Sequence, residues 1–135
     1  MATVRKEVVT RARPDQVWEI IRDIGALHTR LVPGFVTDTR LEPGARIVTF
    51  ANGLTVREPI VTLDEAARRL VWTVEGLRTT HYNASAQALD DPAGTRVVWI
   101  ADFLPDDAAG EIDVAMEAGA QAMKAALDRL DPDAT

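Results

Sequence analysis

The sequence predicts an α+β fold in which seven short β-strands form an antiparallel sheet that wraps around one long C-terminal helix. Residues 107–130 carry apolar side chains at spacings of three and four, the pattern of an amphipathic helix. Residues 35–103 read almost entirely as short strands separated by turn sequences. Such a sheet must bury one face, and the final helix has the only apolar stripe long enough to cover it.

The composition indicates a single globular domain spanning residues 1–135. The chain has 135 residues, of which 47% are hydrophobic and 27% charged, so it can bury one core. No apolar run approaches the ~20 residues that a membrane-spanning helix needs, so we expect no membrane insertion. The first residues lack the basic and apolar layout of a signal peptide, which favours a cytoplasmic location.

Net charge and the scarcity of reactive side chains narrow the function. The formal net charge of −6 disfavours nucleic-acid binding, because phosphates require clustered lysine and arginine. The chain has no cysteine, which excludes disulfides and thiolate chemistry. Its two histidines, His28 and His81, lack the spacing of metal ligands, and no glycine-rich phosphate loop is present. We therefore expect neither a metal nor any other cofactor.

The first part of the chain predicts one strand and two short helices. Val4–Thr10 alternates loosely and reads as the strand. Pro14 and Asp15 suit the first turn of a helix, whose buried side would contain Val17, Trp18, Ile20 and Ile21. A second short helix over residues 25–31 would stop before Pro33.

Six antiparallel strands are expected next. They span Phe35–Leu41, Ala45–Phe50, Leu54–Leu63, Leu70–Glu75, His81–Leu89 and Thr95–Phe103. Turn sequences rich in Gly, Pro, Asn and Asp lie between most of them. Each neighbouring pair can therefore form a hairpin.

The final helix should leave room for a pocket. Its expected buried stripe contains Ile112, Met116, Gly119, Met123, Leu127 and Leu130. Gly119 would bring the helix backbone close to the sheet, whereas the flexible side chains of Met116 and Met123 would border unfilled volume. The sequence therefore predicts a cavity between helix and sheet.

Several local patterns carry a resemblance to a known family. They include Pro14-x-x-x-Trp18, Gly44-Ala45-Arg46, Gly53-x-x-x-x-Glu58, Tyr82-x-Ala84 and Gly94-Thr95-Arg96-x-x-Trp99. Together with the order of elements, they resemble the polyketide cyclase/dehydratase branch, often labelled SRPBCC, of the START-related, pollen-allergen-like superfamily. The resemblance extends over nearly the whole chain and implies the helix-grip fold, in which the sheet grips the C-terminal helix.

Two strands and the final helix supply the predicted walls of the cavity. Because side chains alternate across a strand, Tyr82, Ala84, Ala86 and Ala88 should point inward and leave space beneath the helix. By the same parity Trp72 and Trp99 face the helix, where they either line the pocket or fill the core. The predicted ligand contacts on these elements are Trp72, Ala84, Trp99, Met116, Gly119 and Met123.

Glu58 is the best-supported polar candidate for the functional site. It lies between Val56 and Ile60 on the expected inward face of a long strand. Burial would raise the pKa of its carboxyl and suit it to general acid or base catalysis, whereas pairing with Arg46 would keep it ionised. A bulge or the opposite strand parity would place it on the surface instead.

The resemblance implies that the second short helix lies near one end of the pocket, and this helix contains two polar candidates. His28 could be a base or proton shuttle, since the ordinary pKa of histidine is ~6.5. Arg30 could hold an anionic ligand tail. For both residues, a solvated position on the helix is the alternative.

Three functions remain compatible with these residues. The first is binding of a small apolar or amphipathic molecule. The second is a cofactor-independent polyketide cyclase or dehydratase in which Glu58, Tyr82 or His28 transfers protons. The third is a protein-interaction module, and the sequence also leaves a homodimer open. The scarcity of inward acid–base pairs favours binding over catalysis.

Overall fold

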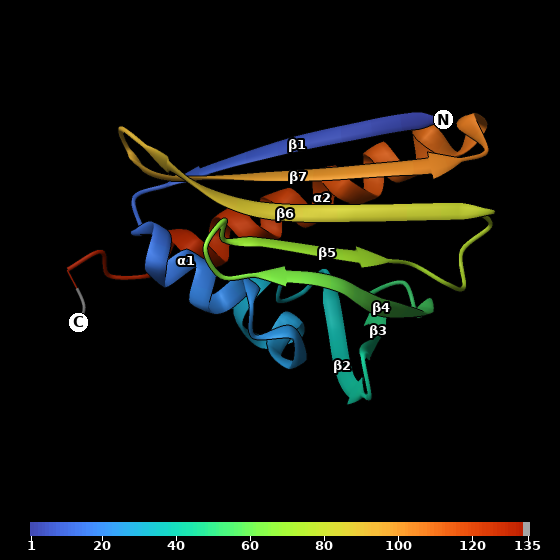
Figure 1. The fold of residues 1–135 in the computed structure, drawn as a ribbon, viewed down its shortest axis with the longest axis horizontal. Helices are drawn as coiled ribbons and strands as arrows, with labels where there is room; N and C mark the ends of the chain where they lie inside the picture. Colours follow the sequence, from blue (N-terminus) through green and yellow to red (C-terminus); the bar gives the residue numbers. More distant parts are fainter. Residues whose placement is uncertain (134–135) are drawn as a thin grey trace.

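Seven strands form one antiparallel sheet in the computed structural model, which describes residues 1–133 (Figure 1). The strands are β1 (Ala2–Thr10), β2 (Val36–Glu42), β3 (Ala45–Phe50), β4 (Thr55–Asp64), β5 (Arg69–Thr73), β6 (His81–Asp91) and β7 (Gly94–Leu104). Their order across the sheet is β1-β7-β6-β5-β4-β3-β2. All neighbours except β1 and β7 are consecutive in the chain, so hairpins build most of the sheet. The predicted fold class is confirmed.

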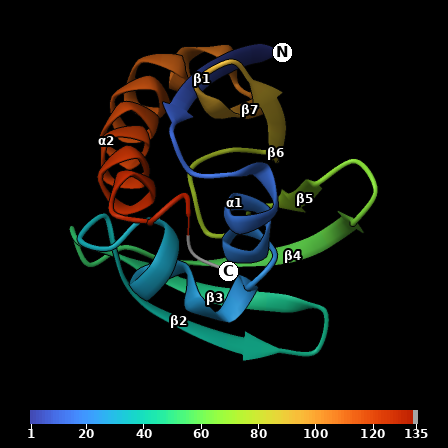
Figure 2. The ribbon, with the colours of Figure 1, turned by 90° about the vertical axis from the view of Figure 1, so that its left-hand side faces the viewer.

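The helices cover the concave face and one end of the sheet. They are α1 (Pro14–Ile21), η1 (Ile24–Ala26), η2 (Leu27–Leu31), η3 (Asp106–Ala108) and α2 (Ala109–Asp128). Figure 2 shows the sheet curving from β1 and β7 around to β3 and β2, with α2 along its open side. The short helices before β2 lie at the end of the molecule that faces the viewer in this figure.

Helix α2 faces the sheet with the apolar stripe expected from the sequence. Its buried residues are Ile112, Met116, Gly119, Ala120, Met123 and Leu127. With η3 it spans 106–128, against the predicted 107–130, a difference within ordinary boundary error. Leu130 lies beyond the helix and is only partly buried.

The region after α1 differs from the prediction. In place of one α-helix over 25–31, the chain forms a three-residue 3₁₀ turn, η1, and a π-helical turn, η2. Gly25 packs closely on Leu41, since a Cβ at Gly25 would lie 3.1 Å from Cγ of Leu41. Pro33 also disfavours the helical conformation at Val32. Because of these two constraints, the segment forms one 3₁₀ turn and one π-helical turn, and it does not form an α-helix over 25–31.

Helix α1 is tied to the rest of the fold through Trp18. This side chain is buried, and its indole Nε1 donates to Oε1 of Glu65, 3.2 Å away in the β4–β5 turn. Arg22 Nε donates to the same oxygen at 2.7 Å. Trp18 therefore belongs to the packing surface of α1.

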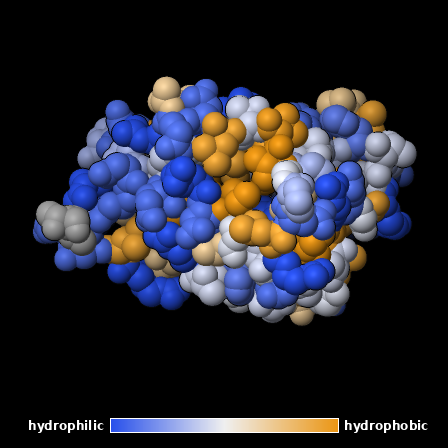
Figure 3. All heavy atoms as spheres, turned by 60° about the horizontal axis from the view of Figure 1, so that its bottom comes forward, coloured by the Kyte–Doolittle hydropathy of each residue, from blue (hydrophilic) through white to orange (hydrophobic). Residues whose placement is uncertain are grey.

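One face of the molecule carries a group of apolar side chains on its surface. Figure 3 shows hydrophobic residues gathered near the middle of one face, with hydrophilic residues around them. The most exposed large hydrophobic side chains within strands and helices include those of Leu41, Val61 and Val114. Within residues 1–133, no helix combines the length and the hydrophobicity needed to cross a membrane.

Candidate ligand-binding cavity

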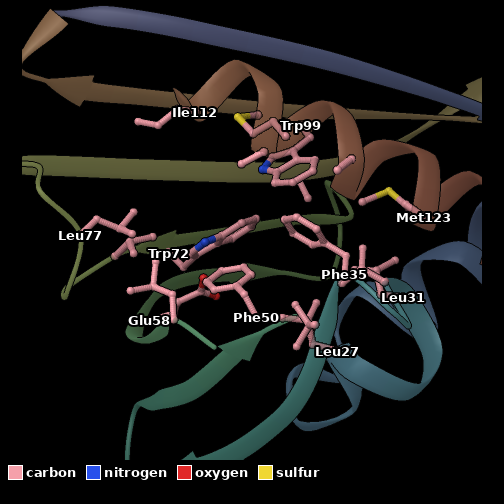
Figure 4. A pocket seen from close by; sticks show the side chains of 18 of the residues that line it. Leu27, Leu31, Phe35, Phe50, Glu58, Trp72, Leu77, Trp99, Ile112 and Met123 are labelled. Carbon is pink, nitrogen blue, oxygen red and sulfur yellow. The ribbon is translucent and has the colours of Figure 1, made fainter. Parts of the chain in front are cut away.

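A cavity of about 530 Å³ lies between the curved sheet and α2 (Figure 4). Small-molecule sites in proteins typically measure ~300–1,000 Å³, so its size suits a ligand of modest dimensions. Strands β3 to β7, helix α2 and the segment from η2 to the start of β2 all contribute side chains. The cavity therefore forms where the sheet, the helix and the short helical turns converge.

Aromatic and aliphatic side chains make up most of the cavity wall. Trp72 comes from β5 and Trp99 from β7, while Phe35 and Phe50 pack edge to face with ring centroids 5.4 Å apart. Figure 4 shows these four rings gathered around the same space. Helix α2 adds Ile112, Met116 and Met123. Such a wall favours a predominantly apolar ligand.

The mouth of the cavity is marked by lining residues that reach the surface. Val114 on α2 is 71% exposed and Leu54 in the β3–β4 turn is 40% exposed. Asn52 and Glu111 also line the cavity and are exposed. The opening therefore lies between α2 and the β3–β4 turn, and two exposed apolar side chains flank it.

A buried ion pair is the main polar feature of the wall. Arg46 on β3 and Glu58 on β4 are register partners, so their side chains leave the sheet on the same face. Arg46 Nε donates to Oε1 of Glu58 at 2.8 Å, and the two side chains are only 3% and 8% exposed. The Arg46 guanidinium also lies 5.3 Å from the ring centroid of Trp72. The indole face therefore gives this cation a second favourable contact.

One carboxylate oxygen of Glu58 remains open to the cavity. No described residue hydrogen-bonds to Oε2. Within residues 1–133, the indole Nε1 of Trp99 is the only fully enclosed side-chain nitrogen or oxygen without a hydrogen bond, so Oε2 is not enclosed by protein. In the view of Figure 4, the Glu58 carboxylate is seen below the Trp72 indole. Oε2 is thus a free acceptor in a largely apolar space.

Burial raises the pKa of the Glu58 carboxyl, and Arg46 opposes this shift. Loss of hydration destabilises the ionised form, whereas the adjacent guanidinium stabilises it. Glu58 therefore holds a proton more readily than an exposed glutamate does. A shift in this direction favours a role as general acid or base near neutral pH.

Tyr82 adds a hydroxyl to the same cavity. Its ring stacks on Phe103 with centroids 5.8 Å apart, and it lines the cavity from β6. Burial, and secondly the negative charge of Glu58, raise the pKa of the Tyr82 hydroxyl. The hydroxyl is therefore protonated at neutral pH, and it has no hydrogen-bond partner among the described residues.

Six of the ten predicted site residues line the cavity together. They are Glu58, Trp72, Tyr82, Trp99, Met116 and Met123. Their roles in binding or catalysis remain predictions, whereas their common location is a property of the structure. The other four, His28, Arg30, Ala84 and Gly119, do not line it.

His28 and Arg30 point away from the cavity because η2 turns other residues inward. Leu27 and Leu31, four positions apart, are buried and line the cavity. His28 Nδ1 instead lies 3.0 Å from Oγ1 of Thr39 on β2. Arg30 donates to Asp23 at 2.8 Å and also pairs with Glu19. Arg30 is therefore occupied by two carboxylates, and the prediction that it meets a ligand is not supported by its position.

Ala84 and Gly119 are enclosed by packing instead of bordering open space. Ala84 is 1% exposed and lies opposite Trp72 in the sheet, while Ala86, two positions later, is the alanine of β6 that lines the cavity. A Cβ at Gly119 would lie 2.8 Å from Cη2 of Trp99. Gly119 thus accommodates a ring that itself forms the wall.

Several lining residues were not predicted from the sequence. Phe50 shares the strand face of Arg46 and Val48, so the alternation of β3 carried a signal that could have identified it. Phe35, Leu31 and Leu77 lie outside regular strands, where alternation gives no orientation. Within residues 1–133, no group of three or more metal-ligating side chains is present.

Comparison with known proteins identifies related folds. A family model described as "Polyketide cyclase / dehydrase and lipid transport" matches residues 1–134. The solved structure of the protein XoxI from Bacillus cereus has a TM-score of 0.82 and 19% identity, covering 94% of this chain and 96% of that one. A START superfamily protein from Mycobacterium smegmatis has a TM-score of 0.73 and 15% identity, covering 96% and 99%.

The protein Ara h 8.0201 is similar at a TM-score of 0.69 and 14% identity, covering 93% of this chain and 97% of its own. None of the curated proteins matches the sequence. At such identities the solved structures establish the helix-grip fold and leave the ligand open.

Proposed function

Since the chain belongs to the polyketide cyclase/dehydrase and lipid transport family, we propose that it binds one small, largely apolar molecule between the sheet and α2. The observation that carries this proposal is the cavity of about 530 Å³ with aromatic and aliphatic walls. The Arg46–Glu58 pair and the Tyr82 hydroxyl would orient a polar group of the ligand. Binding is therefore expected to combine apolar burial with one or two directed hydrogen bonds.

Native mass spectrometry tests this proposal. Protein purified without denaturation from the cells that produce it should carry a small molecule at one copy per chain. An Ala86→Leu variant from the same cells should lack that molecule, because the larger side chain would occupy cavity volume. An equal amount of adduct on both proteins would contradict binding in this cavity.

Proton-transfer catalysis is a second candidate function. The observation that favours it is the raised pKa of the Glu58 carboxyl, whose Oε2 is open to the cavity that Tyr82 also lines. Cyclisation or dehydration of a polyketide-like substrate requires such proton transfers and no cofactor. Glu58 would be the general acid or base, and the Tyr82 hydroxyl would donate a hydrogen bond to a substrate oxygen.

Glu58→Gln separates the two functions. If Glu58 transfers a proton, the substitution should lower turnover by ~10²–10⁴-fold with little effect on the affinity for a neutral substrate. If Glu58 only binds the ligand, affinity alone should change. His28 has no part in either scheme, because it does not line the cavity.

The setting of the protein completes the proposal. We propose a cytoplasmic location. We also propose that the protein has no nucleic-acid partner, because its net charge of −6 disfavours phosphate binding. For the oligomeric state, the proposal leaves both a monomer and a homodimer open. Light scattering coupled to size-exclusion chromatography decides between monomer and dimer.

A further inference from the structure

We infer that the cavity selects uncharged molecules bearing a hydrogen-bond donor, such as an alcohol or phenol, and rejects anionic molecules of the same size. This inference rests on the proposed binding function, since it concerns the ligand of the same cavity. It narrows the ligand class from apolar or amphipathic molecules to neutral hydroxyl compounds. Long-chain carboxylates and sulfonates would be excluded.

The first step is the charge balance of the wall. Of the described residues that line the cavity, Arg46 is the only cation, and Glu58 and Glu111 are anions. Glu111 lies at the mouth, where it pairs with Arg78 at 2.5 Å and both side chains are exposed. The interior thus contains one cation and one anion, 2.8 Å apart.

The second step is that Arg46 is already neutralised. Its Nε is bonded to Glu58, its guanidinium carbon lies over the Trp72 ring, and Nη1 is 3.5 Å from the carbonyl oxygen of Ile24. An anionic ligand would have to compete with Glu58 for this cation. It would then place two negative charges around one guanidinium in a space of low polarity, where an anion also loses its hydration.

The third step is the free acceptor. Oε2 of Glu58 is open to the cavity and has no protein partner among residues 1–133. A ligand hydroxyl can donate to this oxygen, and a hydrogen bond to a charged group is stronger than one between neutral groups. The Tyr82 hydroxyl can bind a second ligand oxygen by donating its proton. A neutral donor therefore satisfies the site without disturbing the ion pair.

Three naphthalene probes substituted at the same ring position test the selection: naphthol, methylnaphthalene and naphthalenesulfonate. Their shared ring system keeps apolar burial nearly constant. By equilibrium dialysis at neutral pH, the wild-type protein should bind naphthol about tenfold more tightly than methylnaphthalene. It should bind naphthalenesulfonate at least about tenfold more weakly than methylnaphthalene.

Glu58→Gln assigns the selection to the ion pair. It removes the negative charge and leaves Arg46 free, so the affinity for naphthalenesulfonate should rise by about tenfold or more. The matched control is Glu75→Gln, which makes the same change in an exposed pair with Arg57 on β4. The control should leave all three affinities unchanged. An equal response of the two variants would overturn the assignment.

A double substitution keeps the test decisive if Glu58→Gln fails to fold. Replacing both Arg46 and Glu58 by Met exchanges the pair for apolar side chains, a change that buried pairs often tolerate. This variant should still bind methylnaphthalene, and naphthol should lose its advantage. Retention of that advantage would overturn the role of Oε2.

The probes also separate this inference from the proposed function. If wild-type protein binds methylnaphthalene and naphthalenesulfonate equally, the cavity binds small molecules and the inference about charge is wrong. If it binds none of the three, the proposed binding function is wrong and the inference falls with it.

Discussion

The indole ring of Trp99 on β7 lies in the notch that Gly119 leaves in α2. A Cβ at position 119 would come within 2.8 Å of Cη2 and 2.9 Å of Cζ3 of Trp99, and within 3.0 Å of Cε2 of Phe35. The missing side chain thus lets an aromatic ring meet the helix backbone. Because Trp99 and Phe35 both line the cavity, this contact sets the position of two of its walls.

Gly119→Ala is expected to destabilise the protein and narrow the cavity. Alanine favours a helix over glycine by ~1 kcal/mol, but overpacking costs ~1–3 kcal/mol, so we expect a net loss of up to about 2 kcal/mol. Chemical denaturation measures the loss, and naphthol affinity should fall as Trp99 is displaced. Gly110→Ala is the control, since nothing lies within 4 Å of its added Cβ, and it should be neutral or stabilising. Equal stability of both variants would contradict this prediction and would show that Trp99 and Phe35 can shift with little loss of unfolding free energy.

Two alanines on the same face of β6 should respond differently to enlargement. Ala86 lines the cavity, so Ala86→Leu should lower naphthol affinity strongly and change stability by less than ~1 kcal/mol. Ala84 is enclosed, so Ala84→Leu should cost ~1–3 kcal/mol of unfolding free energy. Denaturation and dialysis on the same samples measure both effects. A reversed order of the two stability losses would place the open space beside Ala84 after all.

The different outcomes at these two alanines show where strand alternation reaches its limit. Alternation correctly predicts that both residues face inward, because parity depends only on local backbone geometry. Whether an inward position borders open space depends on cross-strand neighbours and on the helix above it. Such long-range contacts are not encoded in a single strand.

Other residues show the same difference between positions that follow from the period of their own element and positions that depend on tertiary contacts. The apolar stripe of α2 and the inward parity of Glu58 were predictable because each repeats with the period of its own element. The placement of Arg30 was not, because it depends on Glu19 and Asp23 in α1 and the turn after it. Phe35 lies just before β2, where no period defines its direction.

Removing one partner of the buried Arg46–Glu58 pair should lower the unfolding free energy strongly, whereas replacing both partners by apolar side chains should lower it little. Arg46→Met leaves the Glu58 carboxylate without its counter-charge and should lower the unfolding free energy by about 3–5 kcal/mol. The double variant with Met at both positions should recover most of this loss. Urea denaturation of the single and double variants measures the coupling. Additive losses would indicate that the two side chains do not act as a pair.

Glu58 should also make stability depend on pH. Its folded-state pKa is raised, so its contribution is fully present below the unfolded pKa of ~4.3 and is lost as pH rises through the folded pKa. The unfolding free energy of wild type minus that of Glu58→Gln should therefore decrease with rising pH in this window. Using the difference cancels the carboxylates whose pKa is lowered, such as Glu7 and Glu19. A difference that increases with pH would mean that pairing with Arg46 outweighs burial.

The most direct test of binding between the sheet and α2 uses the three tryptophans as internal probes. Trp72 and Trp99 line the cavity, whereas Trp18 lies outside it with its indole nitrogen bonded to Glu65. In a heteronuclear NMR titration with naphthol, we expect saturable shifts of the Trp72 and Trp99 indole signals and an unchanged Trp18 signal. No shift at any concentration, or a shift of Trp18 equal to the other two, would contradict a ligand-binding cavity at this position.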